Sequence, residues 1–318
     1  MRIAGSNLNL FEFDYDLTWF AFFLNADETI YGRYGGRDAR SPDSRNTLAG
    51  LRFALERALE AHQQHEKVKT ESTKLPVVRA EDYPAARTTG RNNCIHCHQV
   101  NEFRRAQLQA EGKWTRELLW AYPLPENIGI QLDKDEGNLV KGVFAQSAAA
   151  AVGLQPGDRI EKLNGFSVHS FADAQHALHK APSQGAMPLT WLRDGKPAQA
   201  TLRVAEGWRK TNITWRPSLL DILPSLPASG EDLSAVEKRG LGIPEKGVAF
   251  RQDKFVHSTL KKIGLQKDDV IIGLEGLKLE GTMEDFLGYV RSNYLVGDKV
   301  TINVLRNGKP VDLPITLK

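Results

Sequence analysis

An internal repeat in the C-terminal part of the chain constrains the fold more than any other feature. The segment 153–165, GLQPGDRIEKLNG, returns at 264–276 as GLQKDDVIIGLEG. Farther along, LRDGKP at 192–197 is matched by LRNGKP at 305–310, and each is typical of two strands joined by a tight turn at glycine. Between these signals each copy contains a stretch with helical character, Phe171 to His179 and Met283 to Ser292. The repeat therefore predicts two copies of one module with the same order of elements.

Both copies resemble bacterial PDZ domains along nearly their full length. Such domains bind the end of a peptide as an added strand, beside a helix and a loop whose N–H groups hold the carboxylate. The resemblance assigns that loop to Asn127, Ile128, Gly129 and Ile130 in the first copy, and to Gly240, Leu241, Gly242 and Ile243 in the second.

The same resemblance assigns a helix to one side of each groove. The expected lining residues are Ala172, Gln175 and His176 in the first copy, and Phe286, Leu287 and Val290 in the second. The alternative is that these residues pack the core of their own module. Pro244 lacks an N–H close to the second loop, which weakens the assignment there.

The chain has two cysteines, and they stand three residues apart in the sequence Cys94-Ile-His-Cys-His98. This C-x-x-C-H pattern resembles the attachment site of c-type cytochromes. The resemblance implies a haem c cofactor with thioethers at Cys94 and Cys97 and with His98 as the proximal iron ligand. His62 and His65 are candidates for the distal ligand, and each is otherwise a solvated polar residue.

Two other interpretations use the same side chains. Cys94 and Cys97 could exchange disulfides as a redox dithiol, although such a pair normally follows a strand directly and this one follows a polar linker. A zinc site could combine them with His96 or His98, but no further cysteine exists to complete a four-ligand structural site.

The N-terminal region combines a hairpin signal with a helix signal. Aromatic runs on both sides of a polar break at 25–27 predict a β-hairpin within 19–35, and leucines at three- and four-residue spacing predict a helix after Asn46. This order resembles the C-terminal half of a thioredoxin-like domain over about residues 8 to 62. The segment departs from that family because no C-x-x-C precedes it and Leu17 stands where a cis-proline is usual.

Charge and hydropathy narrow the classes of partner. The net charge is +3 and the basic residues are interleaved with acidic ones, so the sequence does not indicate a nucleic-acid-binding surface. No apolar run approaches the roughly 20 residues of a membrane span. Haem attachment implies a periplasmic or exported protein, yet the first residues lack the pattern of a signal peptide, so we expect the signal to have been removed or to lie upstream.

These observations predict a multidomain α+β chain. We expect a partial thioredoxin-like unit, a linker, a short helical haem-binding segment and two PDZ-like, partly open β-barrels with helices, at 1–66, 67–93, 94–123, 124–207 and 208–318. The predicted function is a periplasmic haem protein that docks a peptide or protein C-terminus and transfers electrons to a redox partner or senses redox state.

No catalytic motif is apparent in the sequence, so an enzyme is not the favoured interpretation. The alternative function is a haem-free peptide-binding scaffold or chaperone with a redox or zinc clasp. A peroxidase-like haem is a third, minor interpretation.

Overall fold

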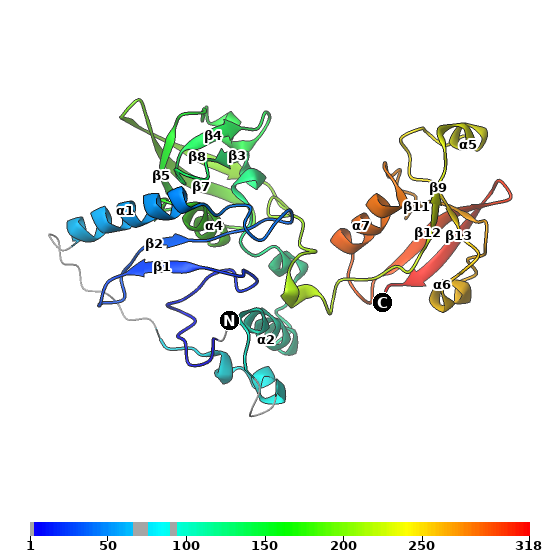
Figure 1. The fold of residues 1–318 in the computed structure, drawn as a ribbon, viewed down its shortest axis with the longest axis horizontal. Helices are drawn as coiled ribbons and strands as arrows, with labels where there is room; N and C mark the ends of the chain where they lie inside the picture. The colour runs from blue at the N-terminus through cyan, green and yellow to red at the C-terminus, as the bar shows by residue number, and fades with distance from the viewer. Residues whose placement is uncertain (1–2, 66–75, 90–93) are drawn as a thin grey trace. The chain divides into compact units, whose positions relative to one another are not determined.

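The computed structural model describes residues 3–65, 76–89 and 94–318, and the chain forms two compact units, Met1–Ser218 and Leu219–Lys318 (Figure 1). Both units contain helices and strands, which confirms the expected mixed multidomain class. The finer division into five parts stays a prediction.

The first unit begins with the hairpin and helix that the sequence predicts. Strands β1 (Ala21–Leu24) and β2 (Ile30–Tyr34) pair antiparallel, and helix α1 (Leu48–His65) follows. The two strands form a sheet of their own, and no third described strand joins it. The expected thioredoxin-like unit is therefore wrong, because this hairpin is not the edge of a larger sheet.

A second group of elements lies between α1 and the first module. It contains η1 (Ala80–Asp82), η2 (Pro84–Thr89), α2 (Cys97–Ala110) and η3 (Arg116–Leu119). The predicted short helix after Cys94 is thus present, and part of the predicted linker is helical. Apolar side chains of α2 share one core with the N-terminal segment; its members include Leu8, Phe13, Ile95, Cys97, Val100 and Phe103.

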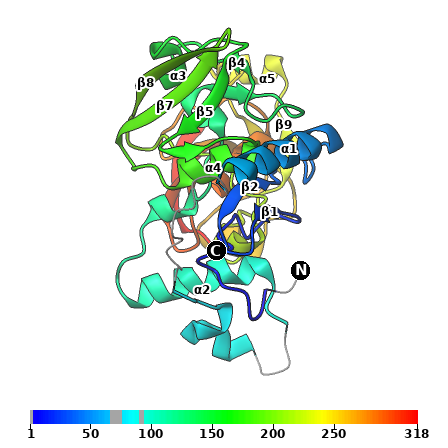
Figure 2. The same cartoon turned by 90° about the vertical axis from the view of Figure 1, so that its left-hand side faces the viewer.

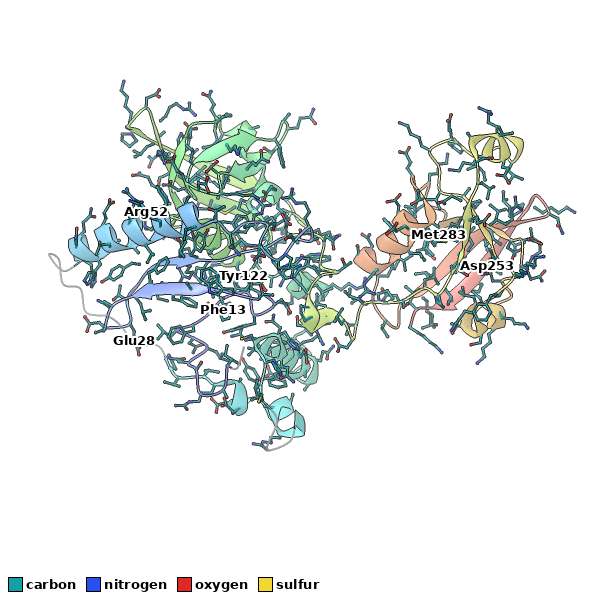
Figure 3. The ribbon with its side chains drawn as sticks, viewed as in Figure 1. Phe13, Glu28, Arg52, Tyr122, Asp253 and Met283 are labelled. Carbon is teal, nitrogen blue, oxygen red and sulfur yellow. The ribbon has the colours of Figure 1, made fainter. Side chains whose placement is uncertain are left out.

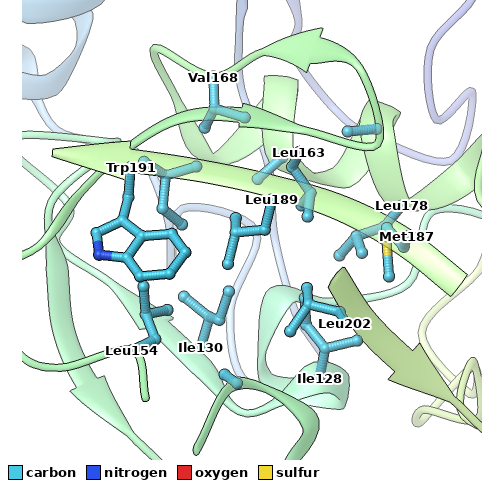
Figure 4. Packing of buried hydrophobic residues seen from close by; sticks show 14 of the residues in the cluster. Ile128, Ile130, Leu154, Leu163, Val168, Leu178, Met187, Leu189, Trp191 and Leu202 are labelled. Carbon is cyan, nitrogen blue, oxygen red and sulfur yellow. The ribbon is translucent and has the colours of Figure 1, made fainter. Parts of the chain in front are cut away.

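The first module follows the order that the repeat predicts. Strands β5 (Arg159–Leu163), β6 (Phe166–Ser167), β7 (Gly185–Arg193) and β8 (Lys196–Val204) form a sheet in the order β6-β5-β7-β8, and β3 (Ile130–Leu132) pairs with β4 (Val140–Val143). Its helices are η4 (Pro125–Ile128), α3 (Ala148–Ala151) and α4 (Phe171–His179). Figure 4 shows the core between these layers, where Ile128, Ile130, Leu189 and Trp191 meet.

The N-terminal hairpin packs against the first module. Strand β2 lies beside α4 in both views of the chain (Figures 1 and 2). A buried ion network also joins the N-terminal segment to the residues after the module, because Arg216 Nη1 lies 2.6 Å from Asp14 Oδ1 and 3.1 Å from Asp16 Oδ2. The N-terminal segment and the first module thus belong to one compact unit.

The second unit repeats the module. Its five-stranded sheet has the order β13-β12-β11-β10-β9, with β9 (Gly230–Asp232), β10 (Phe250–Gln252), β11 (Val270–Leu274), β12 (Lys299–Arg306) and β13 (Lys309–Thr316). The helices are α5 (Ala235–Gly240), α6 (Ser258–Lys262) and α7 (Met283–Asn293), and η5 (Pro217–Leu219) spans the boundary between the units. Both predicted hairpins and both predicted helices of the repeat are confirmed.

Candidate peptide-binding groove

The loop before β3 has a shape that only glycine permits at its last position. Gly129 has φ of +90°, and a Cβ placed on it would lie 2.0 Å from Ser147 Oγ. Ser147 is fixed there because it caps α3, accepting a hydrogen bond from the N–H of Ala150 and donating one to the carbonyl of Phe144. The α3 cap therefore determines how the chain enters β3.

The side chains of this loop hold it in place and do not face a ligand. Ile128 and Ile130 are buried in the core of the module, and Asn127 Nδ2 donates to the carbonyls of Trp208 and Lys210 at 2.8 and 2.9 Å. The N–H groups of Asn127 and Gly129 donate to the carbonyls of Leu124 and Glu126, just before the loop. The side chains of Asn127, Ile128 and Ile130 are thus all engaged within the chain.

The backbone of Ile130 faces the open edge of β3. The N–H of Phe144 donates to the carbonyl of Gly129, and Ile130 pairs with Val143 in the antiparallel register. Residues of such a ladder alternate in direction, so the N–H and C=O of Ile130 point away from β4. An extended peptide could add to β3 at this point. We use the term groove for the space between this edge and α4.

Helix α4 carries the other predicted groove residues, and all three are buried. Ala172, Gln175 and His176 are at most 5% exposed. Gln175 Nε2 donates to the carbonyl of Tyr122 at 2.8 Å, and Tyr122, labelled in Figure 3, stacks on His179 with 4.1 Å between ring centroids. The face of α4 that the sequence assigned to a ligand is thus covered by the chain's own N-terminal part; its role in peptide binding stays a prediction.

Burial controls the charge of this face. Desolvation, with Arg33 and Lys180 nearby, lowers the pKa of His176 to about 3, and desolvation with Lys180 and Arg209 lowers the pKa of His179 to about 3. Desolvation also raises the pKa of Asp173 to about 6, although Arg33 opposes the shift. Both imidazoles are therefore neutral at pH 7.

The second module differs from the sequence prediction at its loop. Residues 240–243 end helix α5, and the N–H groups of Leu241, Gly242 and Ile243 donate to carbonyls of that helix. The strand that corresponds to β3 is β9, because Ser229 accepts from the N–H of Asp253 as Gly129 accepts from Phe144. Sequence reasoning missed this strand, although the capping-box pattern Ser-x-x-Glu at 234–237 signals the helix that follows it.

The helix residues assigned to the second groove belong to the core. Phe286 and Val290 are buried among the sheet residues, and Leu287 packs against the same cluster. The open space in this unit lies elsewhere: a cavity of about 560 Å³ is bordered by residues after α5, by β11 and the loop that follows it, and by β12 and β13.

The residues assigned to a haem are engaged with the protein itself. The side chain of Cys97 is packed in the apolar core of α2, Cys94 is half-buried, and neither forms a disulfide. His98 Nδ1 lies 2.7 Å from Glu102 Oε1 on the next helical turn. No group of three or more His, Cys, Asp or Glu side chains among the described residues is placed to hold a metal ion.

The two candidate distal ligands lie at the end of α1. His62 Nδ1 is 3.2 Å from the hydroxyl of Tyr31, and the rings of His62 and His65 both pack edge-on against the Tyr31 ring. Their neighbours thus come from the N-terminal hairpin.

Comparison with known proteins identifies the first module. Residues 127–204 match the family model for a PDZ domain. A curated relative, the periplasmic pH-dependent serine endoprotease DegQ of Escherichia coli, is 31% identical over 144 residues, which are 45% of this chain and 29% of DegQ. Another, named "Probable periplasmic serine endoprotease DegP-like", from Pseudomonas savastanoi pv. phaseolicola, is 31% identical over 214 residues, covering 64% of this chain and 43% of that protein. The chain spans less than half the length of either relative.

Solved structures resemble a smaller part of the chain. The structure titled HtrA-type protease AlgW with decapeptide is 21% identical, has a TM-score of 0.24, and matches 35% of each chain. A likeness at this level carries no argument about function.

These relatives correct the functional prediction. They are named serine endoproteases and not haem proteins, so the predicted recognition as a haem protein, the haem c cofactor and the electron-transfer or redox-sensing function are wrong. The predicted redox partner has no support in these names. The physical reason lies at Cys97, whose surroundings are filled by the chain's own apolar side chains. The expectation that the chain is not an enzyme is also contradicted by the relatives' names.

The relatives are periplasmic, and no helix within the described residues is both long and apolar enough to cross a membrane. No described histidine ring is hydrogen-bonded to a serine hydroxyl; those rings bond to Tyr31, Glu102, Tyr122 and Thr259. What the geometry and the family model establish together is that residues 127–204 form a PDZ domain.

Proposed function

We propose that this chain recognises extended peptide segments at its PDZ domain, as the peptide-binding part of a periplasmic protein related to serine endoproteases. The observation that carries the proposal is the edge of β3 that does not pair with β4, where the N–H and C=O of Ile130 point away from β4 in a domain that matches the PDZ family. Strand addition to such an edge gives affinity through main-chain hydrogen bonds.

The loop favours strand addition over capture of a terminal carboxylate. The N–H groups of Asn127 and Gly129 already donate to the carbonyls of Leu124 and Glu126. We therefore expect peptides to bind mainly through their backbone, and we expect amidation of the C-terminus to weaken binding by less than about tenfold, a loss below about 1.4 kcal/mol.

The test is a fluorescence titration of the full chain with labelled decapeptides in free-acid and amidated forms. Saturable binding of both forms supports the proposal. A loss of all binding on amidation would show that the terminal carboxylate is the main determinant, and the absence of binding by any peptide would refute peptide recognition.

Serine endoproteolysis by the whole protein is a second candidate function. It rests on the relatives, of which 29% and 43% of the length are matched. Hydrolysis of unfolded casein that is blocked by a serine-directed inhibitor would support it, and an inert purified protein would count against it. Export of the protein to the periplasm, proposed on the same relatives, is tested by cell fractionation.

A further inference from the structure

A buried arginine from the N-terminal part lies between η4, which precedes β3, and the start of α4. Arg45 Nη1 is 2.7 Å from Glu126 Oε1 in η4, and the Arg45 guanidinium lies over the ring of Phe171, the first residue of α4, at 4.7 Å from its centroid. Arg45 is 8% exposed. Because a buried cation is costly without partners, this placement marks a site with the chemistry to hold a guanidinium.

The backbone around Arg45 fits closely against the same borders. A Cβ on Gly36 would lie 2.6 Å from Phe171 Cδ1, so the chain approaches α4 as closely as glycine allows. At the other border Thr47 Oγ1 donates to Asp135 Oδ1 in the turn after β3, at 2.7 Å. Residues 36–47, which we call the Arg45 segment, therefore contact the start of α4 at one end and the turn after β3 at the other.

Charged groups around Arg45 hold the Arg45 segment in place, but some of the buried polar atoms have no hydrogen-bond partner. Asp38 Oδ2 lies 3.1 Å from Arg45 Nη2, and although burial alone would raise the pKa of Asp38, hydrogen bonds from Arg40 and Ser44 and the charge of Arg45 keep it below its ordinary value. Arg45 Nε and Glu126 Oε2 are nevertheless buried without a partner.

An incompletely bonded, desolvated ion pair contributes little net stability. A peptide that adds main-chain hydrogen bonds along β3 would therefore have an advantage over the Arg45 segment once it enters the groove.

We propose that Glu126 and Phe171 form an arginine-binding pocket in the groove, that Arg45 fills it in the resting chain, and that peptide ligands carry an arginine that replaces Arg45. This inference rests on the proposed function and adds the chemical class of the ligand. Arginine fits better than lysine, because a planar guanidinium stacks on an aromatic ring while it bonds a carboxylate.

The experiment titrates the full chain with decapeptides in which one arginine is moved along the sequence, each matched by a peptide with neutral citrulline at the same position. The proteins are the wild type, Arg45→Gln, Glu126→Gln and the control Arg52→Gln, whose exposed side chain pairs only with Glu56 on α1. Circular dichroism confirms that each variant is folded.

We expect Arg45→Gln to tighten binding of the best arginine peptide by about tenfold. This is the gain expected if the state with an empty arginine pocket rises from about a tenth of the population to most of it. Arg52→Gln should leave binding unchanged, and the preference for arginine over citrulline should disappear in Glu126→Gln. Peptides that bind wild type and Arg45→Gln equally, or bind with no preference for arginine, overturn this inference and leave peptide recognition standing. A folded Arg45→Gln protein that binds no peptide while the wild type does also overturns this inference alone, and an absence of binding by every folded protein, the wild type included, overturns both.

Discussion

At the scale of single residues, the repeat is explained by one arginine–aspartate pair in each module. Arg193 donates through Nε and Nη2 to both oxygens of Asp158, at 2.8 and 2.7 Å, and Arg306 does the same to Asp269 at the same distances. Each arginine also donates to the carbonyl of the glycine that opens the repeat. The pair ties the last hairpin to the turn before the central strand.

Arg193→Ala is predicted to destabilise the first unit, because Asp158 is 2% exposed and loses its counter-ion, while the solvent-exposed position of the arginine limits the loss. Burial alone would raise the pKa of Asp158, but Arg193 and the Gln155 N–H keep it below 3.8. Its contribution is therefore present above pH 3.8 and is lost as the pH falls through the folded-state pKa.

Urea unfolding at pH 7 and pH 3 measures this difference, with Arg306→Ala as the matched change in the second unit. Equal stability of Arg193→Ala and wild type at pH 7 would contradict the prediction.

Gly129→Ala is predicted to destabilise the first unit by more than about 2 kcal/mol, since a left-handed alanine costs roughly 1–2 kcal/mol and the added methyl group overlaps Ser147. Gly195→Ala is the control: its φ is +74° and no atom lies within 4 Å of the added Cβ, so only the backbone cost applies. Denaturant midpoints compare the two variants, and equal losses would show that the Ser147 contact is unimportant.

At the scale of elements, the packing of the N-terminal hairpin on α4 makes stability depend on pH. The pKa values of His176 and His179 are both about 3 in the folded chain, below the ordinary 6.5, so their contribution is present above pH 6.5 and declines as the pH falls toward 3. Asp173, with a raised pKa of about 6, acts in the opposite sense between pH 6 and 3.8.

Two histidines outweigh one aspartate, so the first unit should be less stable at pH 5 than at pH 7 by about 2 kcal/mol. Urea unfolding at the two pH values tests this, and the double variant His176→Gln/His179→Gln should lose most of the difference. A first unit that is more stable at pH 5 would contradict the assignment of both imidazoles as buried and neutral.

Elements with local signals could be predicted from the sequence. The spacing of apolar residues gave α4 and α7, and the Asp194-Gly195 and Asn307-Gly308 turns gave both hairpins, since these turns require left-handed residues. The cover over α4 could not be predicted, because the contacts of Arg45 with Glu126 and Phe171 join residues far apart in the chain. The C-x-x-C-H spacing led to a wrong prediction because it is a local pattern. The burial of Cys97 in a core depends on residues far away in the chain, which the local pattern does not report.

At the scale of the whole molecule, each unit has a core of its own. The second unit buries a continuous cluster that includes Phe250, Ile271, Phe286 and Ile302. We therefore predict that residues 219–318 fold as an isolated fragment and unfold cooperatively in urea, followed by circular dichroism. A fragment without cooperative unfolding would show that the second unit depends on the first.

We propose that a bound peptide adds to β3 and displaces the Arg45 segment. Amide hydrogen exchange of the full chain, followed by mass spectrometry with and without a bound decapeptide, distinguishes the two segments. We expect slower exchange at 130–132 and faster exchange at 36–47 when peptide is present. Unchanged exchange in both segments, with protection appearing only elsewhere in the chain, would contradict it.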